Sequence, residues 1–215
     1  ILWGILLQLI LAFLILKTAG GRLIFRIARI AITSIINFSD KGAEFLFGKL
    51  VSDIHIGAIV AFRVLPIIIF VSSLMSILYF LGIIQIVVKF MAKIMHKTMK
   101  ISGVEAIASA LLVFMGIESI TAIRAYISRM TKSEIFTLMC AFMATIASSV
   151  MATYASFGAE PGHLLAASLM SAPAAVVIAK LMIPETESPD TLGEVKFDVK
   201  SADTNIIEAA ATGAY

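Results

Sequence analysis

Long apolar runs, separated by short polar segments, occupy most of the chain before residue 184. The runs 66–88, 135–158 and 164–183 each have about the 20 residues that a bilayer-spanning helix needs. The first run, residues 1–16, is slightly shorter, and Lys17 follows it. The pattern therefore predicts three complete membrane spans and, at the start of the chain, most of a fourth.

Two other segments are both amphipathic and basic. In residues 22–50, Arg22, Arg26 and Arg29 share one helix face and apolar residues occupy another. In residues 87–100, lysines and His96 alternate with apolar positions. We expect both segments to be interfacial helices at the lipid headgroups. For 22–50 the alternative is a helix packed on its own protein, and the positions of the two basic clusters give no orientation in the membrane.

The segment 104–127 is apolar but divided in the middle. Its halves, 104–115 and 119–127, are each too short to cross a bilayer, and they meet at Gly116-Ile117-Glu118-Ser119. This arrangement predicts a re-entrant helical hairpin, whose non-helical backbone must line a cavity or be buried in protein. A carboxylate at that depth is costly, which makes Glu118 a candidate site residue. A glutamate in a headgroup loop is the alternative.

The last two predicted spans carry many small and hydroxyl-bearing side chains. Alanines at helical repeats in 135–158 indicate close packing between helices. We expect the serines and threonines of this span to hydrogen-bond to carbonyls one turn earlier. Pro173 is expected to kink the span 164–183.

Composition narrows the class of protein. Apolar residues make up 60% of the chain, charged residues make up 14%, and the mean hydropathy is +1.02. These values exclude an ordinary soluble domain and a disordered chain. The net charge of +3 comes from basic residues beside apolar runs, which favours lipid headgroups over nucleic acid as partners.

Few residues indicate covalent or metal chemistry. Cys140 is the only cysteine, so the chain can form neither an internal disulfide nor a cysteine metal site. His96 has no carboxylate or second histidine at metal-ligand spacing. The sequence contains neither a nucleophile with an adjacent base nor a phosphate-binding glycine loop. We therefore expect a protein that is not an enzyme and needs no cofactor.

The two ends of the sequence predict a longer protein. Ile1 already lies in an apolar run, with no basic region before it, and residues 184–215 are polar with no further span. We divide the chain into residues 1–103, with spanning and interfacial helices, and residues 104–183, with the hairpin and two spans. Residues 184–215 are then a polar linker towards a missing second half, or alternatively a free regulatory tail.

Several motifs resemble those of the concentrative nucleoside transporters. The similarity covers residues 38–187 and includes Ala61-Phe62-Arg63-Val64-Leu65-Pro66, Ser102-Gly103-Val104-Glu105, Met130-Thr131-Lys132-Ser133-Glu134, the block 163–174 and Pro184-Glu185-Thr186-Glu187. The resemblance implies an all-α polytopic membrane protein that is half of an inverted-repeat transporter and assembles as a homotrimer. It assigns residues 1–103 to the trimerisation scaffold and residues 104–183 to the transport domain.

The resemblance also implies which residues bind the solute. The family's first hairpin carries Gly-Gln-Thr-Glu, whose polar side chains bind the nucleobase. The corresponding stretch here is Gly116-Ile117-Glu118, one residue shorter, and these three residues are the predicted substrate contacts. Glu118 is retained, whereas the glutamine and threonine are not.

An ion site follows from the same resemblance. Thr145 and Ile146 match the family positions that give a hydroxyl and a carbonyl to sodium, and Phe114 is assigned to the same ion. Leu112 stands where the family has a sodium-binding asparagine, and an apolar side chain cannot replace the donors and acceptors of an amide. The coupling ion is therefore predicted to be sodium or a proton, with Glu118 as the titrating group in the second case.

The function that these observations favour is ion-coupled import of nucleosides by alternating access, in a multi-pass protein of the bacterial plasma (inner) membrane. A divergent transporter for another solute is one alternative. Another is a membrane-embedded regulatory or interaction subunit that keeps the scaffold and has lost the nucleoside site. The departures at Leu112 and Ile117 fit either alternative.

Overall fold

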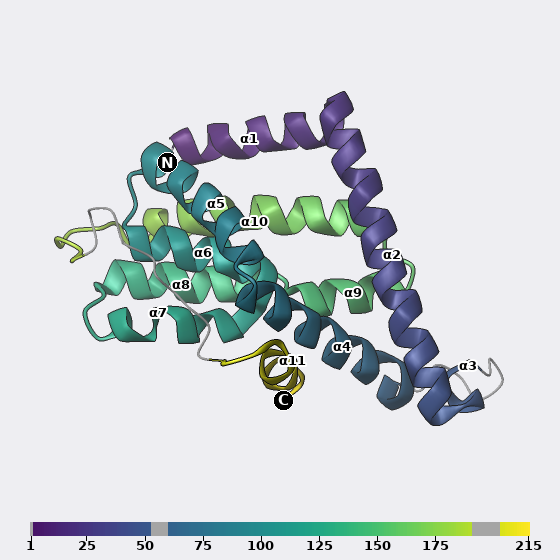
Figure 1. Ribbon diagram of the computed structural model, residues 1–215. Helices are drawn as coiled ribbons and strands as arrows, with labels where there is room; N and C mark the ends of the chain where they lie inside the picture. Colours follow the sequence, from purple (N-terminus) through teal and green to yellow (C-terminus); the bar gives the residue numbers. More distant parts are fainter. Residues whose placement is uncertain (1, 53–59, 191–202) are drawn as a thin grey trace.

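The computed structural model describes residues 2–52, 60–190 and 203–215 (Figure 1). Within these ranges the chain contains α-helices and one 3₁₀ turn but no strand, which confirms the predicted all-α fold. The elements are α1 (Leu2–Lys17), α2 (Ala19–Phe47), α3 (Lys49–Ser52), α4 (Val60–Phe80), α5 (Ile83–Met99), α6 (Gly103–Met115), η1 (Gly116–Ser119), α7 (Ile120–Ile127), α8 (Lys132–Ala144), α9 (Ser148–Ser156), α10 (Pro161–Met182) and α11 (Ile206–Ala214).

Three segments of the described chain are long and apolar enough to cross a membrane. They are Ala61–Phe80 in α4, Lys132–Ser156 across α8 and α9, and Pro161–Met182 in α10. The helices at Leu2–Ile15 and Ala19–Phe47 pass the same test only as a pair, bent by 72°. The multi-pass architecture is thus confirmed, and Figure 1 shows α1, α8 and α10 lying side by side.

The first complete span ends earlier than the sequence predicts. We expected residues 66–88 to form one helix, but α4 ends at Phe80 and α5 begins at Ile83. Gly82 between them has a φ of 82°, a left-handed conformation that glycine adopts without the steric cost that a side chain brings. The prediction of 66–88 as one span is therefore wrong, and Gln85 and Val88 belong to α5.

The predicted division of 104–127 is confirmed. Helix α6 begins with a capping box in which Ser102 and Glu105 exchange hydrogen bonds, and it ends at Gly116, whose φ is 63°. The turn η1 follows, and α7 folds back so that Ile123 packs with Val104 and Ala108. The two short helices therefore form a hairpin.

The span predicted over 135–158 is interrupted. Helix α8 ends at Ala144, Thr145 is extended with φ −115° and ψ 136°, and α9 starts at Ser148. Thr145 and Ile146 are both β-branched, and such residues favour extended backbone. The predicted span is confirmed as Lys132–Ser156, but its backbone unwinds in the middle of the apolar run.

Helix α10 is the central element of the described chain. It contacts α1, α2, α6, α8 and α9, and Ala172, Val176 and Ala179 on it are completely buried. Its first residue is Pro161, which lacks the N–H that would be unpaired in the first turn. The helix is continuous through Pro173, where the sequence predicted a kink.

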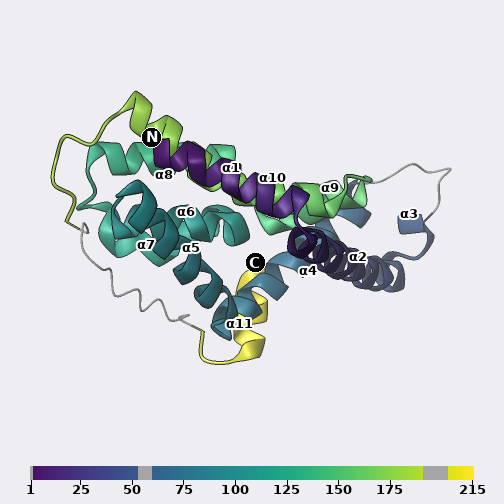
Figure 2. The same cartoon turned by 90° about the horizontal axis from the view of Figure 1, so that it is seen from above.

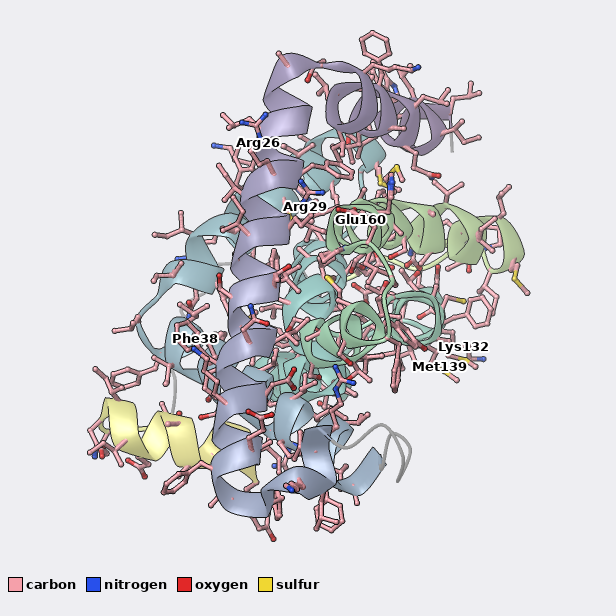
Figure 3. All side chains as sticks on the ribbon, turned by 90° about the vertical axis from the view of Figure 1, so that its right-hand side faces the viewer. Arg26, Arg29, Phe38, Lys132, Met139 and Glu160 are labelled. Carbon is pink, nitrogen blue, oxygen red and sulfur yellow. The ribbon has the colours of Figure 1, made fainter. Side chains whose placement is uncertain are left out.

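Helix α2 runs across the ends of α1, α9 and α10, whereas α8 and α10 run along one another (Figures 1 and 2). A Cβ atom on Gly162 would lie 2.1 Å from the Phe25 ring, so only glycine allows this close crossing. Arg26 and Arg29 are exposed on α2 (Figure 3). Helix α2 therefore packs on its own protein, and its position at the headgroups stays a prediction.

Helix α11 packs tightly on α4 through small residues. Ser73 Oγ donates a hydrogen bond to the Ala210 carbonyl at 2.8 Å. A Cβ atom on Gly213 would lie 2.5 Å from Ser76 Cβ and 2.6 Å from the Ser72 carbonyl. Residues 206–214 are therefore a helix docked on α4.

Candidate ion and solute site

The hairpin turn, the α8–α9 break and the middle of α10 meet through serine hydroxyl groups. Ser148 Oγ donates a hydrogen bond to the Phe114 carbonyl at 2.5 Å, across 34 residues of sequence. Ser168 Oγ donates to the Ile146 carbonyl at 3.3 Å. The Ser171 and Thr145 hydroxyl oxygens lie 3.2 Å apart and share a hydrogen bond. Three elements distant in sequence thus converge on one polar junction.

The junction is polar because two helices are interrupted there. A helix end leaves backbone carbonyls or N–H groups without partners in the helix, and these groups must be satisfied in another way inside an apolar bundle. The carboxyl end of α8 carries a partial negative charge and faces the amino end of α9, which carries a partial positive charge. The break therefore presents carbonyl oxygens suited to a small hard cation.

The structure brings together the three residues that the resemblance assigned to the ion. Phe114 is at the end of α6, while Thr145 and Ile146 form the unwound backbone, and each makes a hydrogen bond within the junction. These positions fit a cation held by neutral oxygens. Clusters of three or more His, Cys, Asp or Glu side chains that could hold a metal do not occur in the described ranges.

Leu112 lies one helical turn before Gly116, and both its side chain and the residues around it are apolar. Its side chain is 1% exposed and packs with Ala141, Ala175 and Phe142. The position where the family has an asparagine is therefore filled by a packed aliphatic side chain. It offers no ligand to an ion.

The predicted solute residues lie at the hairpin turn. Gly116 is buried and allows the reversal of direction with its φ of 63°. Ser119 Oγ donates to the Gly116 carbonyl at 2.7 Å and closes the turn. The backbone of Ile117 and Glu118 belongs to η1, but their side chains lie outside the described part of the structure.

The sequence did not single out Ser148, Ser168 and Ser171 as site residues. The expectation of bonding to the preceding turn is confirmed for Thr153, whose hydroxyl donates to the Ser149 carbonyl at 3.1 Å. By contrast, Ser148 and Ser168 bond across elements. No sequence signal separates the two kinds of hydroxyl, because a helix break must first be located before its polar neighbours can be identified.

A second polar cluster lies at the carboxyl end of α10. Lys180 Nζ is 2.7 Å from Glu105 Oε1, 3.3 Å from Glu185 Oε2 and 2.9 Å from Ser133 Oγ. Glu105 is 1% exposed, and Thr131 Oγ1 donates to Glu185 at 2.9 Å. These contacts join the starts of α6 and α8 to the end of α10.

The ionisation of Glu185 reflects these contacts. Partial burial raises the pKa of its carboxyl group, but hydrogen bonds from Thr131 and the Glu187 amide, together with the Lys180 charge, lower it further than burial raises it. The net result is a pKa below the ordinary value of 4.5. Glu185 is therefore ionised at neutral pH and available to pair with Lys180.

Interrupted helices that meet inside an apolar bundle define a class of helical membrane proteins to which many solute transporters belong. Family comparisons agree with this class. The description "Na+ dependent nucleoside transporter N-terminus" matches residues 1–50, "Nucleoside recognition" matches residues 61–161, and "Na+ dependent nucleoside transporter C-terminus" matches residues 163–215. Together these three matches cover nearly the whole chain, which therefore belongs to the Na⁺-dependent, concentrative nucleoside transporter family.

Two relatives show how similar this chain is to individual proteins. The chain is 40% identical to solute carrier family 28 member 3 of Mus musculus over 216 residues, which cover all of this chain and 30% of the relative. It is 38% identical to sodium/nucleoside cotransporter 1 of Rattus norvegicus, covering 99% of this chain and 32% of the relative. These proteins are about three times as long as this chain.

A solved structure supports the fold directly. CNTnw in an inward-facing, substrate-bound state superposes with a TM-score of 0.89 at 37% identity, covering 99% of this chain and 51% of CNTnw. The chain thus spans about half of that transporter.

Proposed function

We propose that this chain is part of a transporter that imports nucleosides across the plasma membrane, driven by a sodium or proton gradient. The observation that carries the proposal is the junction where Phe114, Thr145 and Ile146 present oxygens between the hairpin and the broken helix. Family membership supports nucleosides as the solute class, and the description of the family as Na⁺-dependent supports sodium as the ion.

The proposed roles follow from chemistry and position. Glu118 accepts hydrogen bonds from donor groups of the solute, and Ile117 gives an apolar contact. Gly116, without a side chain, lets the hairpin backbone approach the solute closely. An ion coordinated by oxygens of Phe114 and of Thr145 or Ile146 links the hairpin to the broken helix. Binding of the ion and binding of the solute then favour one another.

Assembly and location belong to the same proposal. Residues 1–103 act as the trimerisation scaffold of a homotrimer, residues 104–183 carry the hairpin and part of the moving transport domain, and residues 184–215 lead to the second half. The membrane is the inner membrane of a bacterium. Alternating access then requires the transport domain to expose the junction first to one side of the membrane and then to the other.

One observation favours a second candidate, a regulatory or interaction subunit without transport. Leu112 is buried and apolar at a position where the resemblance expects a sodium ligand. A solute that meets unpaired or missing polar groups loses about 1–3 kcal/mol of binding for each of them. If this loss is not compensated elsewhere, the protein keeps the fold but does not move nucleosides.

The test is uridine uptake into proteoliposomes by the full-length protein under a sodium gradient, a proton gradient or no gradient. Sodium-driven uptake would support an ion site that functions with Leu112 in place. Proton-driven uptake that disappears in Glu118→Gln would support Glu118 as the coupling group. If no nucleoside moves under any gradient, the transport proposal fails and the second candidate replaces it.

A matched variant examines the ion site itself. Leu112→Asn restores the amide that the resemblance expects and should lower the sodium concentration that gives half-maximal uptake. The change also places a polar amide in an apolar contact with Ala141 and Ala175, at a cost of about 1–3 kcal/mol if the amide finds no partner. Leu112→Met is the control, because it keeps the position apolar and of similar volume.

A further inference from the structure

Helix α5 carries a row of exposed lysines on the side that faces away from the protein. Lys89, Lys93 and Lys97 are spaced four residues apart, so they lie on one helix face, and all three are exposed. Lys100, also exposed, caps the end of the helix. The opposite face is buried against the hairpin and spans through Ile84, Val88, Ala92 and Met95. Within the described residues, the lysine row therefore takes no part in packing.

The lysine row also lacks a counter-charge. Helix α5 contains no acidic residue. The ion pairs found among the described residues join Arg63 to Asp40 and Lys180 to two glutamates, and none of them includes a lysine of this row. Three parallel positive charges, unpaired within the described fold, create a surface of positive potential.

Exposed apolar side chains border the lysine row on the same helix. Ile86 is 72% exposed, Phe90 is 66% exposed and Val87 is 41% exposed. Helix α5 thus has one face packed on the protein and one open side, on which Ile86 lies among the lysines and Phe90 and Val87 lie beside them. A helix with apolar and basic faces side by side fits a surface that has hydrocarbon next to anions.

Helix α5 links the span α4 to the hairpin. Two residues separate its start from the end of α4, and it runs obliquely to α10 in both views (Figures 1 and 2). It ends at Lys100, directly before the capping box of the hairpin helix α6. A basic amphipathic helix that links a span to a hairpin in this way is expected at a membrane surface.

We propose that the outer face of α5, formed by Lys89, Lys93, Lys97, Ile86 and Phe90, is a binding surface for anionic phospholipids. The lysine ammonium groups contact headgroup phosphates, and the two apolar side chains enter the acyl region below them. Each lysine near an anionic surface raises the affinity about fivefold, so the row as a whole contributes about 100-fold. The lipid thereby holds the connection between α4 and the hairpin against the leaflet.

The experiment measures lipid binding rather than transport, so it stands apart from the proposed function. The full-length protein is purified in mild detergent and titrated with phosphatidylglycerol or phosphatidylcholine, and bound lipids are counted by native mass spectrometry. We expect preferential binding of phosphatidylglycerol. The variant Lys89→Gln/Lys93→Gln/Lys97→Gln should lose about 100-fold in affinity for phosphatidylglycerol and should bind phosphatidylcholine as before.

Two further variants test whether lipid binding depends on positive charge at this face of α5 rather than on lysine itself or on the total charge of the protein. The triple arginine variant at the same positions keeps the charge and should retain phosphatidylglycerol. The variant Arg124→Gln/Arg129→Gln/Lys132→Gln removes three exposed positive charges from the hairpin and the start of α8 and should change the affinity less than fivefold. Equal losses in the two glutamine variants, no preference in the unmodified protein, or stoichiometric capture of an acidic protein in place of lipid would each overturn the proposal.

Discussion

Replacing Lys180 with methionine should destabilise the protein strongly. Lys180 Nζ lies 2.7 Å from Glu105 Oε1, and the Glu105 side chain is only 1% exposed. The other oxygen of this carboxylate accepts a hydrogen bond from the Ser102 amide at 3.2 Å. Without the lysine, Oε1 keeps no partner within the described residues and cannot reach water.

The magnitude follows from this burial. Removing one partner of a buried ion pair costs about 3–5 kcal/mol because it leaves an uncompensated charge. We expect the lower end, about 3 kcal/mol, because Lys180 itself keeps 17% exposure. At about 2–4 °C per kcal/mol for a chain of this size, Tm should fall by about 6–12 °C. The assay is thermal unfolding of the purified protein in detergent, followed by circular dichroism.

Two control variants test whether the buried ion pair stabilises the fold. Lys132→Met removes an exposed lysine at the start of α8 and should leave Tm nearly unchanged. The double variant Lys180→Met/Glu105→Gln removes both charges and should be more stable than Lys180→Met alone. If Lys180→Met unfolds at the same temperature as Lys132→Met, the pair does not stabilise the fold and the argument from burial is wrong.

Three further results are expected. Because the pKa of Glu185 is lowered in the folded state, this group stabilises the fold above about pH 4.5, and the stabilisation is lost as the pH falls through the lower folded pKa. In thermal unfolding between pH 3 and 7, Glu185→Gln should therefore lose less stability in acid than the unmodified protein does. Gly213→Ala places a Cβ atom 2.5 Å from Ser76 Cβ and should cost about 1–3 kcal/mol in unfolding experiments, whereas Gly42→Ala, with open space around it, should not destabilise. Ser171→Ala removes the partner of the Thr145 hydroxyl and should change the sodium dependence of uptake with little effect on Tm, and an unchanged sodium dependence would contradict its place in the junction.

Much of the architecture could be predicted from the order of residues. Apolar runs of membrane length, the divided segment around Gly116 and the basic amphipathic segments are local patterns, and the physics of each depends on neighbouring residues only. The division of the hairpin was correct because two short apolar halves cannot span a bilayer. The end of α4 was misplaced because an apolar run continues through Gly82, and hydropathy does not reveal that the chain turns there.

The functional junction depended on tertiary structure. By itself, the sequence determined that the chain enters a membrane and that its hydroxyl groups lie in apolar helices, because hydrophobicity acts on every segment separately. It did not determine that 135–158 unwinds at Thr145, or that Ser148 reaches Phe114 while Ser168 reaches Ile146. Those hydrogen bonds join residues more than 20 positions apart, so they exist only once packing has brought the hairpin, the break and α10 together.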